Sequence, residues 1–168
     1  GESIQLKVYD FDAVRLCVNT SGPETYPLEE GINKLNIGSG GLGYIDYFTP
    51  AWETAPEVKI HIPSGKVNGY FDRNKHSAAD WQGVLNNAVY GCIDIKGNYI
   101  NLVYGVNSLK TYCTDGMKLI EKYDDITALE YDLMGLVKYD RVPRNHMFAR
   151  VVKSGLFADG WGAGFAED

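Results

Sequence analysis

The residues of this chain that could do chemistry are few and far apart. Its three histidines, His61, His76 and His146, stand in unrelated contexts, and no HExxH motif is present. His76 and Asp80 are four residues apart, a spacing that could hold a metal ion from one face of a helix. No third ligand accompanies them, and Asp80 is equally suited to a helix N-terminus. His61 alternates with apolar residues, which is typical of a structural histidine. The sequence therefore predicts no metal site and no catalytic residue in this chain.

Glycine and cysteine patterns are equally unspecific. The run GSGGLG at 38–43 lacks the GK[ST] ending of a phosphate loop and does not lead into a helical pattern, so we expect a hairpin connection. Cys17, Cys92 and Cys113 form no CxxC pair. Their spacing leaves two arrangements open, one disulfide with a free thiol or three buried thiols.

One long amphipathic segment is the main element on which the rest of the chain is expected to pack. From Asp115 to about Tyr139, apolar residues recur at steps of three and four, which predicts an α-helix. We expect its apolar stripe to face the core and most of its charged residues, Asp124 and Asp125 among them, to face solvent. The helix could also be two helices that meet at these aspartates. The stripe consists of Leu119, Tyr123, Ile126, Leu129, Leu133, Leu136 and Val137.

The first third of the chain has the pattern of short strands. Alternating apolar residues predict strands at 3–8, 14–18, 43–48 and 58–62, with turn residues between them. Strands at this spacing favour a small β-sandwich domain over residues 1–62.

Beyond a boundary at Pro63-Ser64-Gly65, we expect a mixed lobe over 63–168. The pattern predicts a short helix at 78–88, a hairpin of 90–95 with 99–104, and a strand at 147–152. The glycine-rich stretch after 152 is either a mobile loop or a strand whose glycines admit another backbone. The predicted fold class is α+β: a β-sandwich followed by a mixed α/β lobe with one long amphipathic helix.

The amino-acid composition limits the classes of molecule that this chain could bind. The net charge is −6 and no run of Lys or Arg occurs, which argues against docking onto nucleic acid or an anionic membrane surface. No apolar run approaches the 18 or so residues that insertion into a membrane would need. Proteins, glycans or small molecules are the partners that remain.

Several motifs resemble one known family in their order along the chain. They are PEVKIHIPSGKVNGYFD (56–72), ADW (79–81), GNYINL (97–102), YCTDGMKLIEKYDDI (112–126) and LMGLVKYDRVPRNHMFARV (133–151). This series is similar to that of the enhancin-type, mucin-directed zinc metallopeptidases of peptidase family M60. The match is close over 63–150 and looser over 6–62, where it implies a β-sandwich ahead of the peptidase.

The resemblance implies zinc chemistry that this sequence does not itself contain. Such enzymes are similar to other gluzincins in holding Zn²⁺ with HExxH and a downstream carboxylate. We therefore expect this chain to be the N-terminal portion of a secreted or cell-surface hydrolase, ending before the HExxH helix and inactive alone. Zn²⁺ is implied for the complete enzyme, together with the missing C-terminal catalytic part as a partner and glycoproteins such as mucins as substrates. An export signal would then have been removed.

The same resemblance implies a substrate site near the end of the chain. Residues 158–165 would form or flank the edge strand that receives substrate, with glycines that leave room for a backbone and an aromatic face for a sugar. The expected substrate-binding residues are Gly160, Trp161, Gly162, Gly164 and Phe165. The alternatives are a glycan- or protein-binding module that uses Trp52 or Trp161, and a spacer domain.

Overall fold

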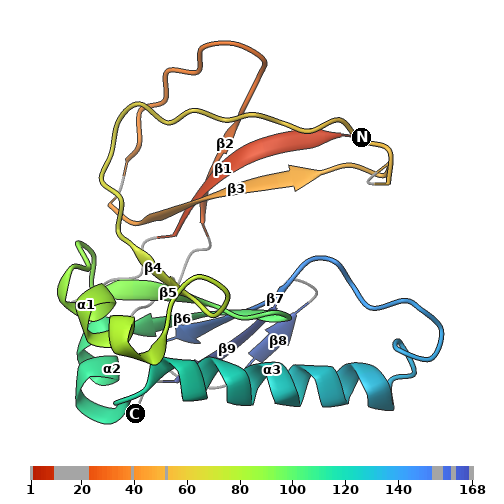
Figure 1. Ribbon diagram of the computed structural model, residues 1–168. Helices are drawn as coiled ribbons and strands as arrows, with labels where there is room; N and C mark the ends of the chain where they lie inside the picture. The colour runs from red at the N-terminus through yellow and green to blue at the C-terminus, as the bar shows by residue number, and fades with distance from the viewer. Residues whose placement is uncertain are drawn as a thin grey trace.

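A computed structural model describes residues 2–9, 23–38, 40–51, 53–152, 157–159 and 162–166 of the chain. Its elements form three layers: a small sheet lies over one face of a larger sheet, and helices cover the other face (Figure 1). The elements are β1 (Ser3–Tyr9), β2 (Glu24–Pro27), β3 (Leu42–Phe48), β4 (Tyr70–Asp72), the 3-10 helix η1 (Ala78–Asp80), α1 (Trp81–Asn86), β5 (Cys92–Lys96), β6 (Ile100–Gly105), α2 (Val106–Tyr112), α3 (Gly116–Leu133), β7 (Met147–Val152), β8 (Phe157–Asp159) and β9 (Gly162–Ala166). The predicted α+β class is confirmed.

The small sheet has the order β2-β1-β3, and both outer strands run antiparallel to β1. Gln5 stands opposite Asp46 in this register, and the ammonium of Lys7 lies 2.6 Å from Asp46 Oδ2. The strands predicted at 3–8 and 43–48 are therefore confirmed.

The predicted β-sandwich is not found in the part of 1–62 that the structure describes, which contains one three-stranded sheet and no second sheet facing it. The strand predicted at 58–62 is wrong. Val58, Ile60 and Ile62 do alternate along the chain, but all three are exposed and the segment joins no ladder. Alternation of apolar residues is compatible with a strand but does not suffice to form one. A strand also needs a neighbouring strand that hydrogen-bonds to its backbone N–H and C=O groups. The strand predicted at 14–18 lies outside the described residues, and the domain division at residue 62 stays a prediction.

The large sheet has the order β4-β5-β6-β7-β9-β8. The predicted hairpin is confirmed as the antiparallel pair β5 and β6, while β6, β7 and β9 run parallel to one another. Register partners on neighbouring strands share a face. Tyr70, Asp94 and Val103 therefore form one row across β4, β5 and β6, on the face toward the small sheet.

The main core lies on the other face of this sheet, under the helices. Trp81 and Leu85, predicted to pair on a short helix, are both fully buried there. The Trp81 indole Nε1 donates a hydrogen bond to the Cys113 carbonyl oxygen at 2.9 Å, and Gly116 lies against the indole ring. The buried members of this core are Phe71, Trp81, Leu85, Ile93, Ile95, Ile100, Leu102, Val106, Leu109, Ile120 and Ala149.

The long helix is shorter than predicted and is turned differently. It ends at Leu133, and residues 134–140 form turns. Leu129 is 59% exposed and Leu133 is 78% exposed, so the C-terminal half of the predicted stripe faces outward. The buried residues also recur at helical spacing, and they are Gly116, Ile120, Asp124, Thr127 and Tyr131. The helix thus has two faces that could pack on the core, and the face with more polar residues is the buried one.

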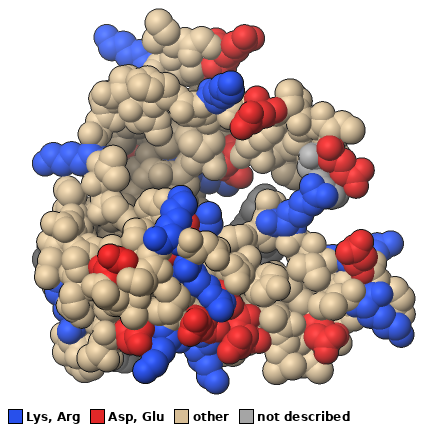
Figure 2. Space-filling view, in the orientation of Figure 1, with Lys and Arg blue, Asp and Glu red and all other residues tan. Residues whose placement is uncertain are grey.

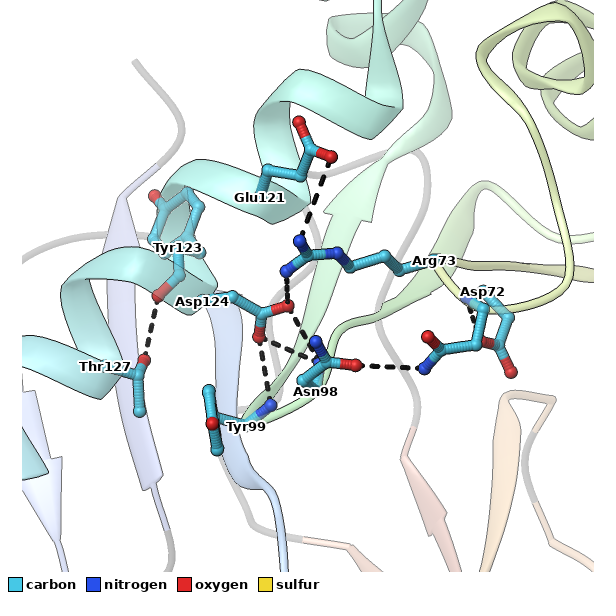
Figure 3. Close-up of polar contacts among 9 residues, drawn as sticks. Asp72, Arg73, Asn98, Tyr99, Glu121, Tyr123, Asp124 and Thr127 are labelled. Atoms are coloured by element: carbon cyan, nitrogen blue, oxygen red, sulfur yellow. Dashed lines mark hydrogen bonds and ion pairs between the residues drawn. The ribbon is translucent and has the colours of Figure 1, made fainter. Parts of the chain in front are cut away.

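A buried carboxylate explains this choice. Asp124, only 2% exposed, accepts hydrogen bonds from the backbone N–H groups of Asn98 and Tyr99 at 2.9 Å. Arg73 Nη1 lies 2.6 Å from Asp124 Oδ2, and Glu121 flanks the same guanidinium (Figure 3). The charges of Asp124 and Arg73 are paired with each other, and the N–H groups of the turn have an acceptor. This face of α3 can therefore be buried without an unpaired charge. The Asp124 cluster thus fixes α3 to the turn between β5 and β6.

Of the cysteines, Cys92 is disulfide-bonded, whereas Cys113 is a free thiol whose pKa is raised by burial. One disulfide with a free thiol is therefore the arrangement found. Among the described helices, none is both long enough and apolar enough to cross a membrane.

Candidate functional site

The predicted substrate residues fall on the last two strands of the large sheet. Gly162, Gly164 and Phe165 belong to β9, and Gly160 and Trp161 lie outside the described residues. β9 pairs with β7 on one side and with β8 on the other. Gly162 and Gly164 have partners in both neighbouring strands, so they do not themselves receive an added backbone.

The outer position belongs instead to β8. Among the described strands, β8 is the last at this end of the sheet, and Ala158 pairs with Ala163 of β9. Within the described sheet, β8 is outermost and β9 lies next to it, and the role of 158–165 as the edge that receives substrate stays a prediction.

The histidines do not converge on a metal site. His61 is exposed, and His76 Nδ1 accepts a hydrogen bond from the Asp72 N–H at 2.9 Å. His146 Nδ1 lies 3.0 Å from Asn101 Oδ1, and burial lowers the His146 pKa. Asp80 accepts hydrogen bonds from the backbone N–H and hydroxyl of Ser77, both at 2.8 Å. Asp80 thus completes a capping box at η1, which is the helix-terminus role that the sequence left open.

No group of three or more His, Cys, Asp or Glu that could hold a metal ion occurs in the part of the chain that the structure describes. A zinc site of high affinity needs three or four convergent ligands. The described residues therefore do not fit a zinc ion.

A pocket of about 630 Å³ opens where the small sheet, the 66–70 segment and β5 meet. It contains one carboxylate, Asp94, at the middle of an apolar strand. Figure 2 shows acidic and basic side chains interspersed over one face of the molecule. The lining residues are Gly40, Gly41, Leu42, Gly43, Lys66, Val67, Asn68, Gly69, Tyr70, Val89, Tyr90 and Asp94.

Asp94 also links the two sheets. The Tyr44 hydroxyl of β3 donates a hydrogen bond to Asp94 Oδ1 at 2.7 Å. Burial raises the Asp94 pKa to about 6, and the Tyr44 hydrogen bond offsets part of that rise. Burial and the neighbouring carboxylate raise the pKa of Tyr44 well above its usual range. Around the pair, the rings of Tyr9 and Phe148 lie 5.5 and 5.6 Å from the Tyr44 ring.

Sequence reasoning missed Asp94. A signal was available, because CIDIK places an acidic side chain at the centre of a strand whose other inner residues are apolar. An aspartate at such a position needs a partner or a pocket, since an isolated buried carboxylate is strongly disfavoured. The sequence could not name the partner, because Tyr44 is 50 residues away.

Comparison with known proteins gives matches to solved structures. No family model matches the sequence, and no curated protein matches it. A metallopeptidase from Bacteroides thetaiotaomicron is 26% identical with a TM-score of 0.79, over 99% of this chain and 29% of that one. A metallopeptidase in complex with Tn antigen is 23% identical with a TM-score of 0.78, over 99% of this chain and 32% of that one.

A third structure is the M60 catalytic domain of ZmpC from Clostridium perfringens in complex with the sialyl T antigen. It is 14% identical with a TM-score of 0.68, over 97% of this chain and 38% of that one. The second and third likenesses concern the fold alone, and the chain spans about a third of the length of these structures. The resemblance that the sequence motifs indicate is confirmed: over nearly its whole length, this chain is similar to part of the M60-type metallopeptidases.

Proposed function

We propose that this chain is the substrate-binding lobe of a secreted zinc metallopeptidase that acts on glycoproteins, and that the zinc ligands lie in another part of the polypeptide. The chain alone would then be inactive. The observation that carries the proposal is the similarity of nearly the whole chain to metallopeptidase structures, two of which hold the Tn and sialyl T antigens.

The sheet edge supplies the means of binding. An extended peptide can add to an outer strand through backbone hydrogen bonds, and such pairing orients the scissile bond. β8 is the outer described strand at its end of the sheet, and β9 behind it is held on its far side by β7. Support from two further strands favours a rigid edge.

An outward apolar row on α3 and the turn after it supports the idea that this lobe packs on another. Apolar patches of this kind mark interaction surfaces in soluble proteins, whereas scattered single residues do not. We propose that the zinc-bearing part of the enzyme covers this row. Its exposed members are Ile126, Leu129, Leu133, Met134, Val137 and Tyr139.

The test needs a longer polypeptide that includes an HExxH segment. In it, Trp161→Ala should lower kcat/KM on a glycopeptide about tenfold or more, equivalent to roughly 1.4 kcal/mol, with zinc content and melting temperature unchanged. Phe48→Ala is the matched control, because Phe48 is an exposed aromatic residue on an outer strand of the small sheet. Equal kcat/KM for both variants would remove Trp161 from the site, and absence of zinc-dependent cleavage would overturn the proposal itself.

The alternative is a glycan- or protein-binding module without catalysis. The pocket beside Asp94 favours this reading, whereas the platform expected at Trp52 or Trp161 lies outside the described residues. Binding of a glycopeptide by the longer polypeptide, without cleavage, would support the alternative.

A further inference from the structure

A second site lies at the other end of the large sheet from β8. The pocket beside Asp94 borders β4 and β5, the first two strands of the sheet order, whereas β8 is the last. Its volume of about 630 Å³ falls within the usual range for sites that take a small molecule, about 300 to 1,000 Å³. This pocket is therefore distinct from the edge to which we assign the peptide substrate.

The pocket is built in advance by Asn68. Its side-chain Nδ2 donates to the Cys92 carbonyl oxygen at 2.8 Å, and its Oδ1 accepts from the N–H groups of Val89 and Tyr90 at 3.0 and 2.6 Å. These three hydrogen bonds tie the 66–70 segment to the chain entering β5. A wall held this way loses little freedom when a ligand binds, which favours affinity.

Asp94 provides an acceptor inside the pocket. One of its oxygens, Oδ1, accepts from Tyr44, and Asp94 Oδ2 has no hydrogen-bond partner among the described residues. Tyr70 stands beside Asp94 in the register and accepts from Lys75 Nζ at 2.7 Å, so its own O–H remains a donor. Donor and acceptor thus border the same space.

The remaining walls are flat or open. Two aromatic residues, Tyr70 and Tyr90, are among the lining residues, as are the exposed Val67 and Val89. At Gly40, an added Cβ would meet no atom within 4 Å, so the space next to this lining residue is open. A sugar ring has the matching chemistry, because its C–H face packs on aromatic rings while its hydroxyls donate and accept.

The pocket carries one positive and one negative side chain, which together favour a neutral ligand. Lys66 lines the pocket and disfavours an ammonium ligand, while Asp94 disfavours an anionic one such as a sialic acid. We propose that this pocket binds a single neutral sugar residue, a hexose or an N-acetylhexosamine, with its hydroxyls on Asp94 and its apolar face on Tyr90 or Tyr70. The site would hold a glycoprotein by its glycan, independently of any zinc chemistry.

NMR titration of the 168-residue chain tests the proposal. The probes are methyl α-glycosides of galactose, glucose and N-acetylgalactosamine, with methylamine as the cationic probe. At least one glycoside should shift the amide signals of Gly40, Gly69 and Tyr90, with a dissociation constant on the order of 1 mM. Absence of any shift up to on the order of 50 mM glycoside would overturn the proposal. Shifts with methylamine and none with a glycoside would overturn it too.

Variants separate this pocket from binding elsewhere. Asp94→Asn keeps the shape and removes a charged acceptor, and Gly40→Leu adds a bulky side chain at the open position while leaving the Asp94 carboxylate in place. Each should weaken glycoside binding about tenfold or more. Asp125→Asn is the control, because Asp125 is exposed on α3 and outside the pocket lining. Unchanged affinity in both pocket variants, or equal loss in the control, would refute the assignment.

Discussion

At the residue scale, two glycines of the helices have opposite surroundings. A Cβ added at Gly116 would fall inside the contact distance of the Trp81 ring, whereas a Cβ added at Gly83 would meet no atom within 4 Å. Alanine favours a helix over glycine by up to about 1 kcal/mol, but overpacking a rigid core costs about 1 to 3 kcal/mol. The sign of the effect on stability therefore depends on the neighbour rather than on the residue type.

We expect Gly116→Ala to lower the free energy of unfolding by about 1 to 3 kcal/mol, because the rigid indole of Trp81 must move. Gly83→Ala should raise it by about 0.4 to 1 kcal/mol. Urea unfolding of both variants measures the difference. Equal changes would show that the indole yields more easily than its buried position indicates.

Asp94 makes the stability of the fold depend on pH. Its pKa rises from 3.8 to about 6 in the folded protein, because burial disfavours the charged form. Between about pH 4 and pH 6 the folded state therefore holds a proton that the unfolded state has released. The contribution of Asp94 to the free energy of unfolding therefore falls as pH rises from about 4 to about 6. Above about pH 6 this contribution stays at its lower value.

Urea unfolding of the wild type and Asp94→Asn at about pH 4, 5, 6 and 7 measures this contribution, since asparagine does not titrate. Relative to the variant, the wild type should lose about 1 to 3 kcal/mol between about pH 4 and pH 7. Parallel profiles of the two proteins would mean that Asp94 is well solvated in the folded state.

At the scale of the element, α3 has two faces that sequence periodicity cannot rank. The stripe predicted to be buried is the more apolar, yet Ile126, Leu129 and Leu133 are exposed. The buried face instead carries Asp124 and Thr127, whose polar groups have partners: Asp124 meets the β5–β6 turn, and the Thr127 hydroxyl donates to the Tyr123 carbonyl oxygen. Partners distant in sequence made this face the better one to bury.

Four alanine variants rank the two faces. We expect Ile120→Ala to cost about 2 to 5 kcal/mol and Leu129→Ala under about 0.5 kcal/mol, because only Ile120 is buried. Asp124→Ala should cost about 3 kcal/mol or more, since it leaves Arg73 and two turn amides without their acceptor. Asp125→Ala is its exposed control and should cost under about 0.5 kcal/mol. Similar urea midpoints for Ile120→Ala and Leu129→Ala would contradict this orientation of α3.

At the scale of the whole molecule, the described parts of the two sheets contact each other through the Tyr44–Asp94 hydrogen bond and a group of aromatic rings. The Tyr44–Asp94 hydrogen bond is surrounded by Tyr9, Phe148 and the buried Leu42 and Val103. The small sheet is thus fixed over one face of the large sheet, and the helices over the other (Figure 1). The pocket proposed for a sugar lies at one end of this arrangement and the β8 edge at the other.

The purified 168-residue chain should neither retain stoichiometric zinc nor cleave casein or mucin. The reason is the ligand set: the sequence has no HExxH, and the histidines whose contacts the structure describes are separately engaged. Metal analysis after dialysis measures the first and gel assays the second. Close to one zinc per chain would contradict this prediction and would also place a ligand set where we find none.

By itself, the sequence determined the local elements whose signals are local. The strand at 3–8, the β5–β6 hairpin around Gly97 and the short helix with Trp81 and Leu85 follow from alternation, turn residues and helical spacing. The motif series also indicated the relatives that the solved structures confirm. The patterns that predict these features lie within a few residues, although β1 itself pairs with β2 and β3 farther along the chain.

Only the tertiary structure decided which face of α3 is buried, that residues 58–62 form no strand, and that Asp94 lies in a pocket between the sheets. Each depends on a partner many residues away, such as Asn98 for Asp124 or Tyr44 for Asp94. Burial of a polar group becomes acceptable only when its hydrogen bonds are completed, and a strand forms only beside a neighbour. Since a sequence pattern records neither, it placed Asp124 in solvent and gave Asp94 no role, although Asp124 fixes the long helix and Asp94 lies in the pocket.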